Sequence, residues 1–382
     1  MKEDIIPFYT PSDKVIVKSE DCYLYDSEGN KYIDFESGVW CSNIGHGNGK
    51  INSVIEKQIN ETIHHGYYFR NKLAEQLSLK LQELIGFKGG ASVFLSSGSE
   101  AVNLAITLAR YFTSKRKILK IHNSYLSAFG FGLLSNDNES LVNIKYNDLE
   151  AIDQIDFSDI SALVIETGGA SVDMVKFPDN DFVNKLIACS QKNKCLIIAE
   201  EVTTGMGRMG KWFGFQHYDF TPDMVVAGKA LGNGYPISSV ILNSTLADKF
   251  RQNSFRYAQS HQNDPLGCAI ALEVIKTIET HNLIERASLT GEYFKTQLEN
   301  LRSKYPEGVK ETRTRGLMLA IELYDSINGA AISEELFENG FVAGFKLNTF
   351  RFLPPLTIKH SDIDQLIGKL DEILSRKRNS TN

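Results

Sequence analysis

The sequence lacks the features of a protein that crosses a membrane or is secreted. No stretch approaches the roughly 20 consecutive apolar residues that a membrane span needs. The first residues, MKEDIIPFYT, have neither the basic start nor the apolar run of a secretory signal. The five cysteines are odd in number and scattered, with no CxxC pair. These absences predict a cytoplasmic protein with reduced thiols, no membrane partner and no zinc site.

An excess of positive charge is also absent. The net charge of −6 argues against nucleic acid or an anionic membrane surface as a partner. A hydrophobic content of 42% with 23% charged residues is ordinary for a globular protein. Because 382 residues are too many for one simple core, we expect two lobes or one large domain with appendages.

Apolar strands alternate with helical segments through the middle of the chain. The strands are KILKI (117–121), ALVIE (162–166), CLIIAEE (195–201) and MVVA (224–227). This alternation predicts an α/β fold with a mainly parallel sheet and helices on both faces. Ligands of such sheets bind beyond the carboxyl ends of the strands.

The two ends of the chain read differently. CYLYDSEGNKYIDF predicts a hairpin around a turn at 27–30. After residue 276, TRGLMLAIEL (314–323) and NTFRFLPPLTI (348–358) predict strands of a smaller lobe, followed by a final helix.

Lys229 directly follows one of the predicted buried strands, and glycines and a proline then interrupt regular structure. Desolvation at the mouth of a buried strand favours the neutral amine. The neutral amine can attack a carbonyl and form a Schiff base. The alternative is a lysine at a strand end whose charged group reaches solvent.

A serine–glycine turn, Ser96-Ser97-Gly98-Ser99, joins the predicted strand at 91–95 to a helix with apolar residues at helical spacing. The start of a helix offers unpaired N–H groups and the positive end of the helix dipole, which suit an anion. An ordinary N-cap followed by Glu100 needs the same residue types, so both interpretations stay open.

Pyridoxal phosphate (PLP) uses all of these groups together. It needs a lysine for its aldehyde, an anion site for its phosphate, an aromatic side chain on its ring and a carboxylate opposite the ring nitrogen. Tyr125 follows one predicted strand and Glu200 ends another. A buried carboxylate without a cationic partner is costly, so a cationic ring would explain Glu200.

Four segments resemble, in this order, the class III (ornithine/ω-amino acid) aminotransferases of PLP fold type I. They are SSGSEAVNLA, AEEVTTGMGRMGKWFGF, PDMVVAGKALGNGYPI and RGLMLAIEL. The resemblance spans nearly the whole chain. It implies a large domain with a mainly parallel sheet, a smaller α+β domain, and a homodimer with active sites at the subunit interface. We expect residues 1–40 to join the small domain, 41–275 to form the PLP-binding domain and 276–382 to form the small domain.

The resemblance also implies roles for residues at the cofactor. Lys229 matches the Schiff-base lysine, and Tyr125 matches the aromatic residue that stacks on the ring. Gly98 and Ser99 match the phosphate turn, with Ser97 beside it.

Other matches concern the partner subunit and the substrate. Ser260 stands where the family usually has a threonine that reaches the phosphate across the dimer. Trp40 is similar to a pocket-wall residue of the ω-transaminases, and Arg351 matches an arginine that receives a substrate carboxylate. Trp40 and Tyr125 could instead be plain core aromatics.

Several positions depart from the family pattern. Glu200 replaces the usual aspartate beside the ring nitrogen, and Thr203 replaces a glutamine near the ring hydroxyl. Ala128 replaces the arginine that clamps the α-carboxylate in ornithine and acetylornithine members. Ser171 stands roughly where ornithine enzymes have a glutamate that neutralises the second arginine. Neither ornithine nor acetylornithine is therefore the expected substrate.

We expect a PLP-dependent aminotransferase that moves an amino group from an amine or amino acid donor to a keto acid, aldehyde or ketone. Lys229 would hold the cofactor and act as the base, while Glu200 would stabilise the electron sink. The departures at Glu200 and Ala128 leave open a PLP-dependent aminomutase, decarboxylase or lyase. A non-catalytic protein with this fold is a third hypothesis. His46, His122 and His261 lack metal-ligand spacing, so we expect no metal.

Overall fold

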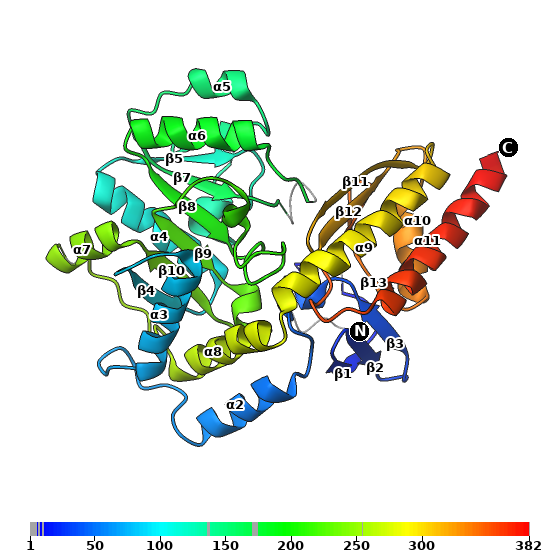
Figure 1. The fold of residues 1–382 in the computed structure, drawn as a ribbon, viewed down its shortest axis with the longest axis horizontal. Coiled ribbons are helices and arrows are strands. Elements are labelled where there is room, and N and C mark those ends of the chain that lie inside the picture. The colour runs from blue at the N-terminus through cyan, green and yellow to red at the C-terminus, as the bar shows by residue number, and fades with distance from the viewer. Residues whose placement is uncertain are drawn as a thin grey trace.

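A seven-stranded sheet forms the centre of the larger part of the molecule in the computed structural model (Figure 1). The structure describes residues 6, 8, 9, 11–135, 138–169, 175–253 and 255–381. In spatial order the strands are β4 (Ala91–Leu95), β10 (Ser238–Leu242), β9 (Met224–Ala227), β8 (Leu196–Glu201), β7 (Ile160–Glu166), β5 (Lys117–Ile121) and β6 (Leu141–Ile144). Strand β10 runs antiparallel to β4 and β9, and the other neighbours are parallel. The predicted mainly parallel sheet is confirmed.

Helices cover both faces of this sheet because alternate residues of its buried strands point to opposite sides. In β7, Ala162 and Val164 pack in the core that lies under α4, whereas Leu163 and Ile165 pack in the core under α6. The helical segments around the sheet are α2 (Gly49–Ile59), α3 (Lys72–Ile85), α4 (Gly98–Thr113), η1 (Gly130–Leu133), α5 (Leu149–Asp153), α6 (Asn180–Lys192), η2 (Gly214–His217), η3 (Lys229–Gly232), α7 (Ser244–Gln252) and α8 (Pro265–Thr280).

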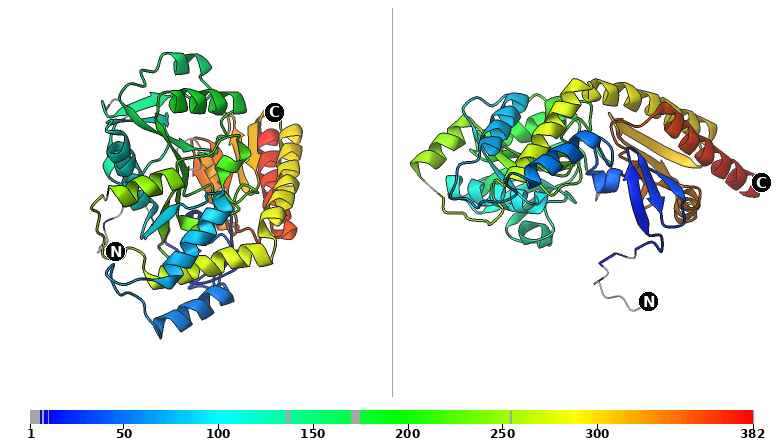
Figure 2. Two further views of the ribbon diagram at one scale, coloured as in Figure 1. Left: turned by 60° about the vertical axis from the view of Figure 1, so that its left-hand side comes forward. Right: turned by 90° about the horizontal axis from the view of Figure 1, so that it is seen from below.

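The smaller part combines the two ends of the chain, as the right-hand view in Figure 2 shows. One four-stranded sheet has the order β1 (Ile16–Glu20), β2 (Tyr23–Asp26), β3 (Lys31–Asp34), β13 (Phe341–Val342). A second has the order β11 (Val309–Arg315), β12 (Met318–Leu323), β15 (Thr349–Phe352), β14 (Gly344–Lys346). The helical segments are α1 (Ser37–Trp40), α9 (Leu283–Lys304), α10 (Gly329–Glu338) and α11 (His360–Thr381). The antiparallel pairing of β2 with β3 confirms the predicted hairpin.

Two strands predicted near the carboxyl end are wrong in extent. The segment 314–323 is a hairpin rather than one strand, because Gly316 (φ 57°) turns the chain between β11 and β12. The segment 348–358 is a strand only over β15, which ends before Pro354 and Pro355, residues without an N–H for a sheet.

Phe35 joins the N-terminal strands to the carboxyl-terminal elements. Its ring centroid lies 6.0 Å from that of Phe294 in α9 and 6.0 Å from that of Phe352 in β15. Because Phe35 is fully buried, this packing fixes the segment that follows it, Glu36 to Trp40. Over the ranges described, no helix combines the length and apolar character needed to cross a bilayer.

Candidate active site

Lys229 and Glu200 lie at the carboxyl ends of neighbouring strands in the large sheet. Glu200 is in β8, where it pairs with Val226 of β9, and Lys229 begins the turn η3 after β9. On the other side Glu200 pairs with Glu166 of β7. The parallel register therefore gathers an amine and two acids at the carboxyl ends of adjacent strands.

The side chain of Lys229 is partly buried. Its Nζ donates a hydrogen bond to Thr203 Oγ1 (2.9 Å) and lies 4.3 Å from the ring centroid of Trp40. Burial lowers the pKa of Lys229, while the charges of Glu200 and Glu166 act in the opposite direction. The environment favours the neutral, nucleophilic form of this amine more than water does.

Glu200 is a buried acid with an incomplete set of partners. Its side chain is 4% exposed, and within the described chain its carboxylate accepts one hydrogen bond, from the Val202 N–H (3.0 Å). Burial raises its pKa, and Lys229 lowers it. A carboxylate in this position has capacity for a further donor or cation.

The adjacent Glu201 has a different role. Its carboxylate accepts hydrogen bonds from Thr204 Oγ1 (2.6 Å), the Gly214 N–H (2.7 Å) and the Phe215 N–H (2.7 Å). Burial raises its pKa to about 7. Glu201 therefore fixes the loop that leads to η2.

The turn before α4 caps the helix through Ser97 and leaves two of the first N–H groups of the helix without an acceptor among the described residues. Ser97 Oγ accepts from the Glu100 N–H (3.2 Å), and Glu100 accepts from the Ser97 N–H (2.9 Å). The N–H groups of Gly98 and Ser99 make no hydrogen bond to any residue that the structure describes. A Cβ at Gly98 would lie 2.8 Å from Val202 Cγ1, so the turn packs closely against the chain that follows Glu200. Ser97 is occupied as a cap, whereas the next two N–H groups point to no partner.

The loop with Tyr125 is held against the first turns of α4. The Ala128 N–H donates to Ser99 Oγ (2.8 Å), and Asn103 Nδ2 donates to Ser127 Oγ (2.9 Å). Tyr125 itself is 44% exposed and so is not a core aromatic.

Ser260 is exposed, and its neighbour lies beside the same turn. Gln259 Nε2 donates to Ser96 Oγ (3.3 Å) and to Glu100 Oε1 (3.3 Å). The structure thus brings the segments of Ser97 to Ser99, Tyr125 and Ser260 together at the start of α4.

Trp40 and Arg351 meet at the same site, together with an acid that the sequence analysis missed. Arg351 lies with its Cζ 4.4 Å from the Trp40 ring centroid, and it donates from Nε and Nη2 to Glu36 (3.1 and 3.0 Å). Trp40 Nε1 also donates to Glu36 Oε2 (3.2 Å). Burial raises the pKa of Glu36, against the effect of Arg351. One indication of Glu36 was available in the sequence: an acidic residue placed between a predicted strand and the loop that carries Trp40.

Arg208 is a second missed residue. Its side chain is 1% exposed, and it donates to the carbonyls of Leu317 (3.1 Å) and Pro354 and to Ser37 Oγ (3.3 Å). Burial lowers its pKa to about 9, while Glu36 and Asp34 raise it. An arginine between glycines in MGRMG was the available signal.

The segment Ser37–Trp40 is a left-handed helical turn. Its φ angles are 46° (Ser37), 57° (Gly38), 59° (Val39) and 69° (Trp40). The Trp40 N–H donates to the Glu36 carbonyl (2.6 Å) and the Cys41 N–H to that of Ser37 (2.9 Å). This conformation costs roughly 1–2 kcal/mol for each residue other than glycine. The surrounding contacts must therefore hold it in place.

Two other predictions concern residues away from this site. Ser171 lies outside the residues that the structure describes. His261 Nδ1 and His64 Nδ1 lie 2.6 and 2.5 Å from the two oxygens of Asp264. Each imidazole Nδ1 is thus already used by a carboxylate.

Comparison with known proteins identifies the family. The aminotransferase class-III profile matches residues 8–132 and 130–374. The acetylornithine aminotransferase of Methanocaldococcus jannaschii is 32% identical over 94% of this chain and 93% of that protein. The ornithine aminotransferase of Oceanobacillus iheyensis is 29% identical over 96% of this chain and 95% of that protein. The acetylornithine aminotransferase structure from Elizabethkingia anophelis superimposes with a TM-score of 0.86 at 27% identity, covering 97% of this chain and 96% of that one.

The chain belongs to the class III aminotransferases and is a PLP-dependent enzyme of that family. The residues at the site fit this cofactor. An amine of lowered pKa lies beside a buried acid whose one hydrogen bond among the described residues comes from the Val202 N–H, and two N–H groups at a helix start have no acceptor among those residues. These groups suit an aldehyde, a ring nitrogen and a phosphate respectively.

Proposed function

We propose that Lys229 joins the PLP aldehyde as a Schiff base and that Glu200 lies beside the ring nitrogen. The observation that carries the proposal is the pairing of a desolvated amine with a buried, under-bonded acid on adjacent strands. Bound PLP supplies an electron sink for the carbanion formed at the substrate. Lys229 Nζ, which is oriented by its hydrogen bond to Thr203 Oγ1, would also act as the base that takes the proton from the amine-bearing carbon of the substrate.

The phosphate would bind to the N–H groups of Gly98 and Ser99 at the start of α4. Ser97 supports this turn as its cap, and Tyr125 would stack on the cofactor ring from a loop bonded to Ser99. Ser260 would reach the phosphate of the partner subunit, as its match to the family's threonine implies; its exposure supports this, since a residue that reaches across a dimer must lie at the surface of the single chain.

Arg351 would receive a substrate carboxylate next to the Trp40 ring. Glu36 accepts from Nε and Nη2 of Arg351, so a substrate carboxylate that binds this edge of the guanidinium must replace Glu36. A keto acid acceptor can make this exchange, whereas a plain amine donor does not require it. Because residue 128 is alanine, it cannot supply an arginine clamp, and we propose no α-carboxylate site there.

We further propose a cytoplasmic homodimer with the domain division 1–40, 41–275 and 276–382. Free thiols at all five cysteines support the location. The exposed Ser260 supports the dimer, and pairing of β3 with β13 supports joining residues 1–40 to the small domain. Light scattering that gave the mass of one chain for the PLP-loaded protein would contradict the dimer.

The reaction is tested by incubating the PLP-loaded protein with amines, amino acids and ω-amino acids in the presence of pyruvate or 2-oxoglutarate. We expect the aminated keto acid to appear, and we expect Lys229→Ala to abolish it. Decarboxylated, isomerised or eliminated donor without any transferred amine would favour the mutase, decarboxylase or lyase alternative. Absence of every product across the panel would favour a non-catalytic protein.

A further inference from the structure

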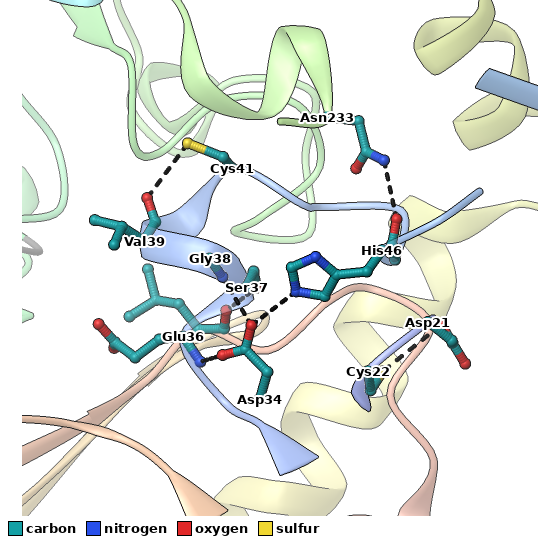
Figure 3. Close-up of polar contacts among 12 residues, drawn as sticks. Asp21, Cys22, Asp34, Glu36, Ser37, Gly38, Val39, Cys41, His46 and Asn233 are labelled. Carbon is teal, nitrogen blue, oxygen red and sulfur yellow. Dashed lines mark hydrogen bonds and ion pairs between the residues drawn. The ribbon is translucent and has the colours of Figure 1, made fainter. Parts of the chain in front are cut away.

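The left-handed turn Ser37–Trp40 touches the site and has four successive residues with positive φ. Asp34 is the last residue of β3, shortly before this turn, and it is 1% exposed. Figure 3 shows its carboxylate facing the turn. Its Oδ1 accepts from the Glu36 N–H (2.8 Å), and its Oδ2 accepts from the Gly38 N–H (2.8 Å). These bonds connect one buried side chain to the residue before the turn and to a residue inside it.

His46 completes this arrangement from the other end of the loop. Its Nε2 lies 2.8 Å from Asp34 Oδ2, and since an ionised carboxylate only accepts, His46 is the donor (Figure 3). A Cβ at Gly38 would lie 3.2 Å from His46 Cε1, so residue 38 leaves space for this ring. Asp34 is therefore held by His46 while it holds the turn.

The turn determines where two side chains of the site are placed. Glu36 precedes it and bonds Arg351, and Trp40 ends it and contacts both Lys229 Nζ and Arg351. If the turn relaxed to the usual right-handed conformation, the Cβ directions of these residues would change relative to each other. The contacts with Lys229 and Arg351 would then be lost.

We propose that Asp34 is a positioning residue that holds Ser37–Trp40 left-handed and thereby places Trp40 and Glu36 against Lys229 and Arg351. The inference rests on the proposed roles of Lys229 and Arg351. If Asp34 only capped the end of the strand, relieving strain in the turn would not compensate for its loss. If Asp34 holds the turn left-handed, relieving that strain should make Asp34 less necessary.

Val39 is the residue at which strain can be relieved. It is β-branched, left-handed and 61% exposed. Glycine adopts positive φ without a steric penalty, so Val39→Gly should keep the turn left-handed when Asp34 is weakened.

The experiment compares Asp34→Asn, Val39→Gly and the double variant in the full chain loaded with PLP. Asparagine keeps the shape of Asp34 but puts an NH₂ group where an oxygen accepted a hydrogen bond. Asp26→Asn is the matched control, because Asp26 is buried and also accepts backbone N–H groups, from Glu28 and Asn30, in the remote β2–β3 hairpin.

We expect Asp34→Asn to lower kcat/KM by up to about 100-fold, the cost of a misplacement of about 1 Å in an active site. The double variant should recover most of this loss, and Asp26→Asn should not show it. Borohydride trapping should still label Lys229 in Asp34→Asn. The fluorescence of Trp40, measured with Trp212→Phe in every variant, should shift in Asp34→Asn and return in the double variant.

The proposal is wrong if Asp34→Asn behaves like Asp26→Asn, if Val39→Gly gives no recovery, or if Asp34→Asn loses the label on Lys229. Should Asp34→Asn fail to fold, the same comparison is made with His46→Leu, which removes one donor to Asp34 and leaves both backbone bonds. Absence of the label in the unaltered protein would contradict the proposed function instead, and the Trp40 signals would still decide the role of Asp34.

Discussion

At the scale of single residues, Glu200 and Glu201 differ in how many hydrogen bonds their carboxylates accept, and this difference suggests a ligand-binding role for Glu200 and a structural role for Glu201. The two acids are adjacent in β8 and both are buried. Glu201 has hydrogen-bond donors at both carboxylate oxygens, whereas Glu200 has the Val202 N–H alone among the described residues. Burial without full satisfaction is expected where a ligand supplies the missing partner.

We predict that Glu200→Gln lowers kcat by roughly 100-fold or more, because a charge opposed to the ring nitrogen is lost. Glu200→Asp keeps the charge on a shorter arm, so it should retain much more activity than Glu200→Gln. Steady-state kinetics with a donor identified in the screen measures both. Equal losses in the two variants would contradict an electrostatic role for Glu200.

Glu36 should determine how tightly carboxylate substrates bind. Glu36→Gln removes the charge that competes for Arg351, so KM for keto acids should fall roughly tenfold, equivalent to ~1.4 kcal/mol. KM for a plain amine donor should change little, since that donor does not use Arg351. Arg351→Gln provides the opposite test and should raise KM for the keto acid alone. A rise in both KM values in Glu36→Gln would show that Glu36 is needed only for packing.

The positions of Lys229 and Glu200 at neighbouring strand ends were predictable from the sequence, because each residue falls at the end of an apolar run. Glu36 and Arg208 were not, since their partners are about 110 to 315 residues away along the chain. Periodicity contains no information on which buried charges compensate one another across such distances.

At the scale of elements, the hairpin β11–β12 holds Arg208 of the 206–210 loop in place through the turn between its strands. Leu317 donates its N–H to the Arg208 carbonyl (2.9 Å), and Arg208 returns a hydrogen bond to the Leu317 carbonyl (3.1 Å). The sequence 314–323 predicts one strand because the apolar residue Leu317, in the turn, directly precedes the apolar residues of β12. The turn depends on one glycine and on a contact with the 206–210 loop, which no local pattern encodes.

We predict that Gly316→Ala is far more destabilising than Gly29→Ala. Both glycines have positive φ, 57° and 86°, but a Cβ at Gly316 would lie 2.5 Å from the Met209 carbonyl carbon, whereas one at Gly29 has nothing within 4 Å. The shared backbone cost is about 1 kcal/mol. The clash at Gly316 should add roughly 1–3 kcal/mol. Urea unfolding measures the difference, and equal costs would contradict the close packing of the hairpin on the loop.

The acids at the end of β8 should make stability depend on pH. The pKa of Glu201 is raised from 4.5 to about 7 by burial, so the folded protein retains a proton that the unfolded chain has lost in this interval. Its contribution is therefore fully present below pH 4.5 and is lost as the pH rises through about 7. One such group changes the free energy of unfolding by up to about 3 kcal/mol.

The corresponding experiment compares urea unfolding of the unaltered chain and Glu201→Gln at pH 5 and at pH 8. The fall in stability between the two pH values should be smaller in the variant, because glutamine does not titrate. An equal fall in both proteins would show that Glu201 is ionised across the interval.

At the scale of the whole molecule, the fold brings the N-terminal strands, the large sheet and the carboxyl-terminal hairpins to one site (Figure 1). Trp40 comes from the first of these, Lys229 from the second and Arg351 from the third. The strand–helix alternation predicted the large sheet well, because each parallel strand carries its own local signal. The convergence of the three parts at Trp40 depends on the core around Phe35, which only the folded chain defines.

The central claim is that Lys229 is the residue to which the cofactor is joined. The most direct measurement is reduction of the PLP-loaded protein with borohydride, followed by digestion and mass spectrometry of the labelled peptide. We predict a pyridoxyl group on the peptide that contains Lys229, and its loss in Lys229→Ala. A label on any other lysine, or one that persists in Lys229→Ala, would contradict the account.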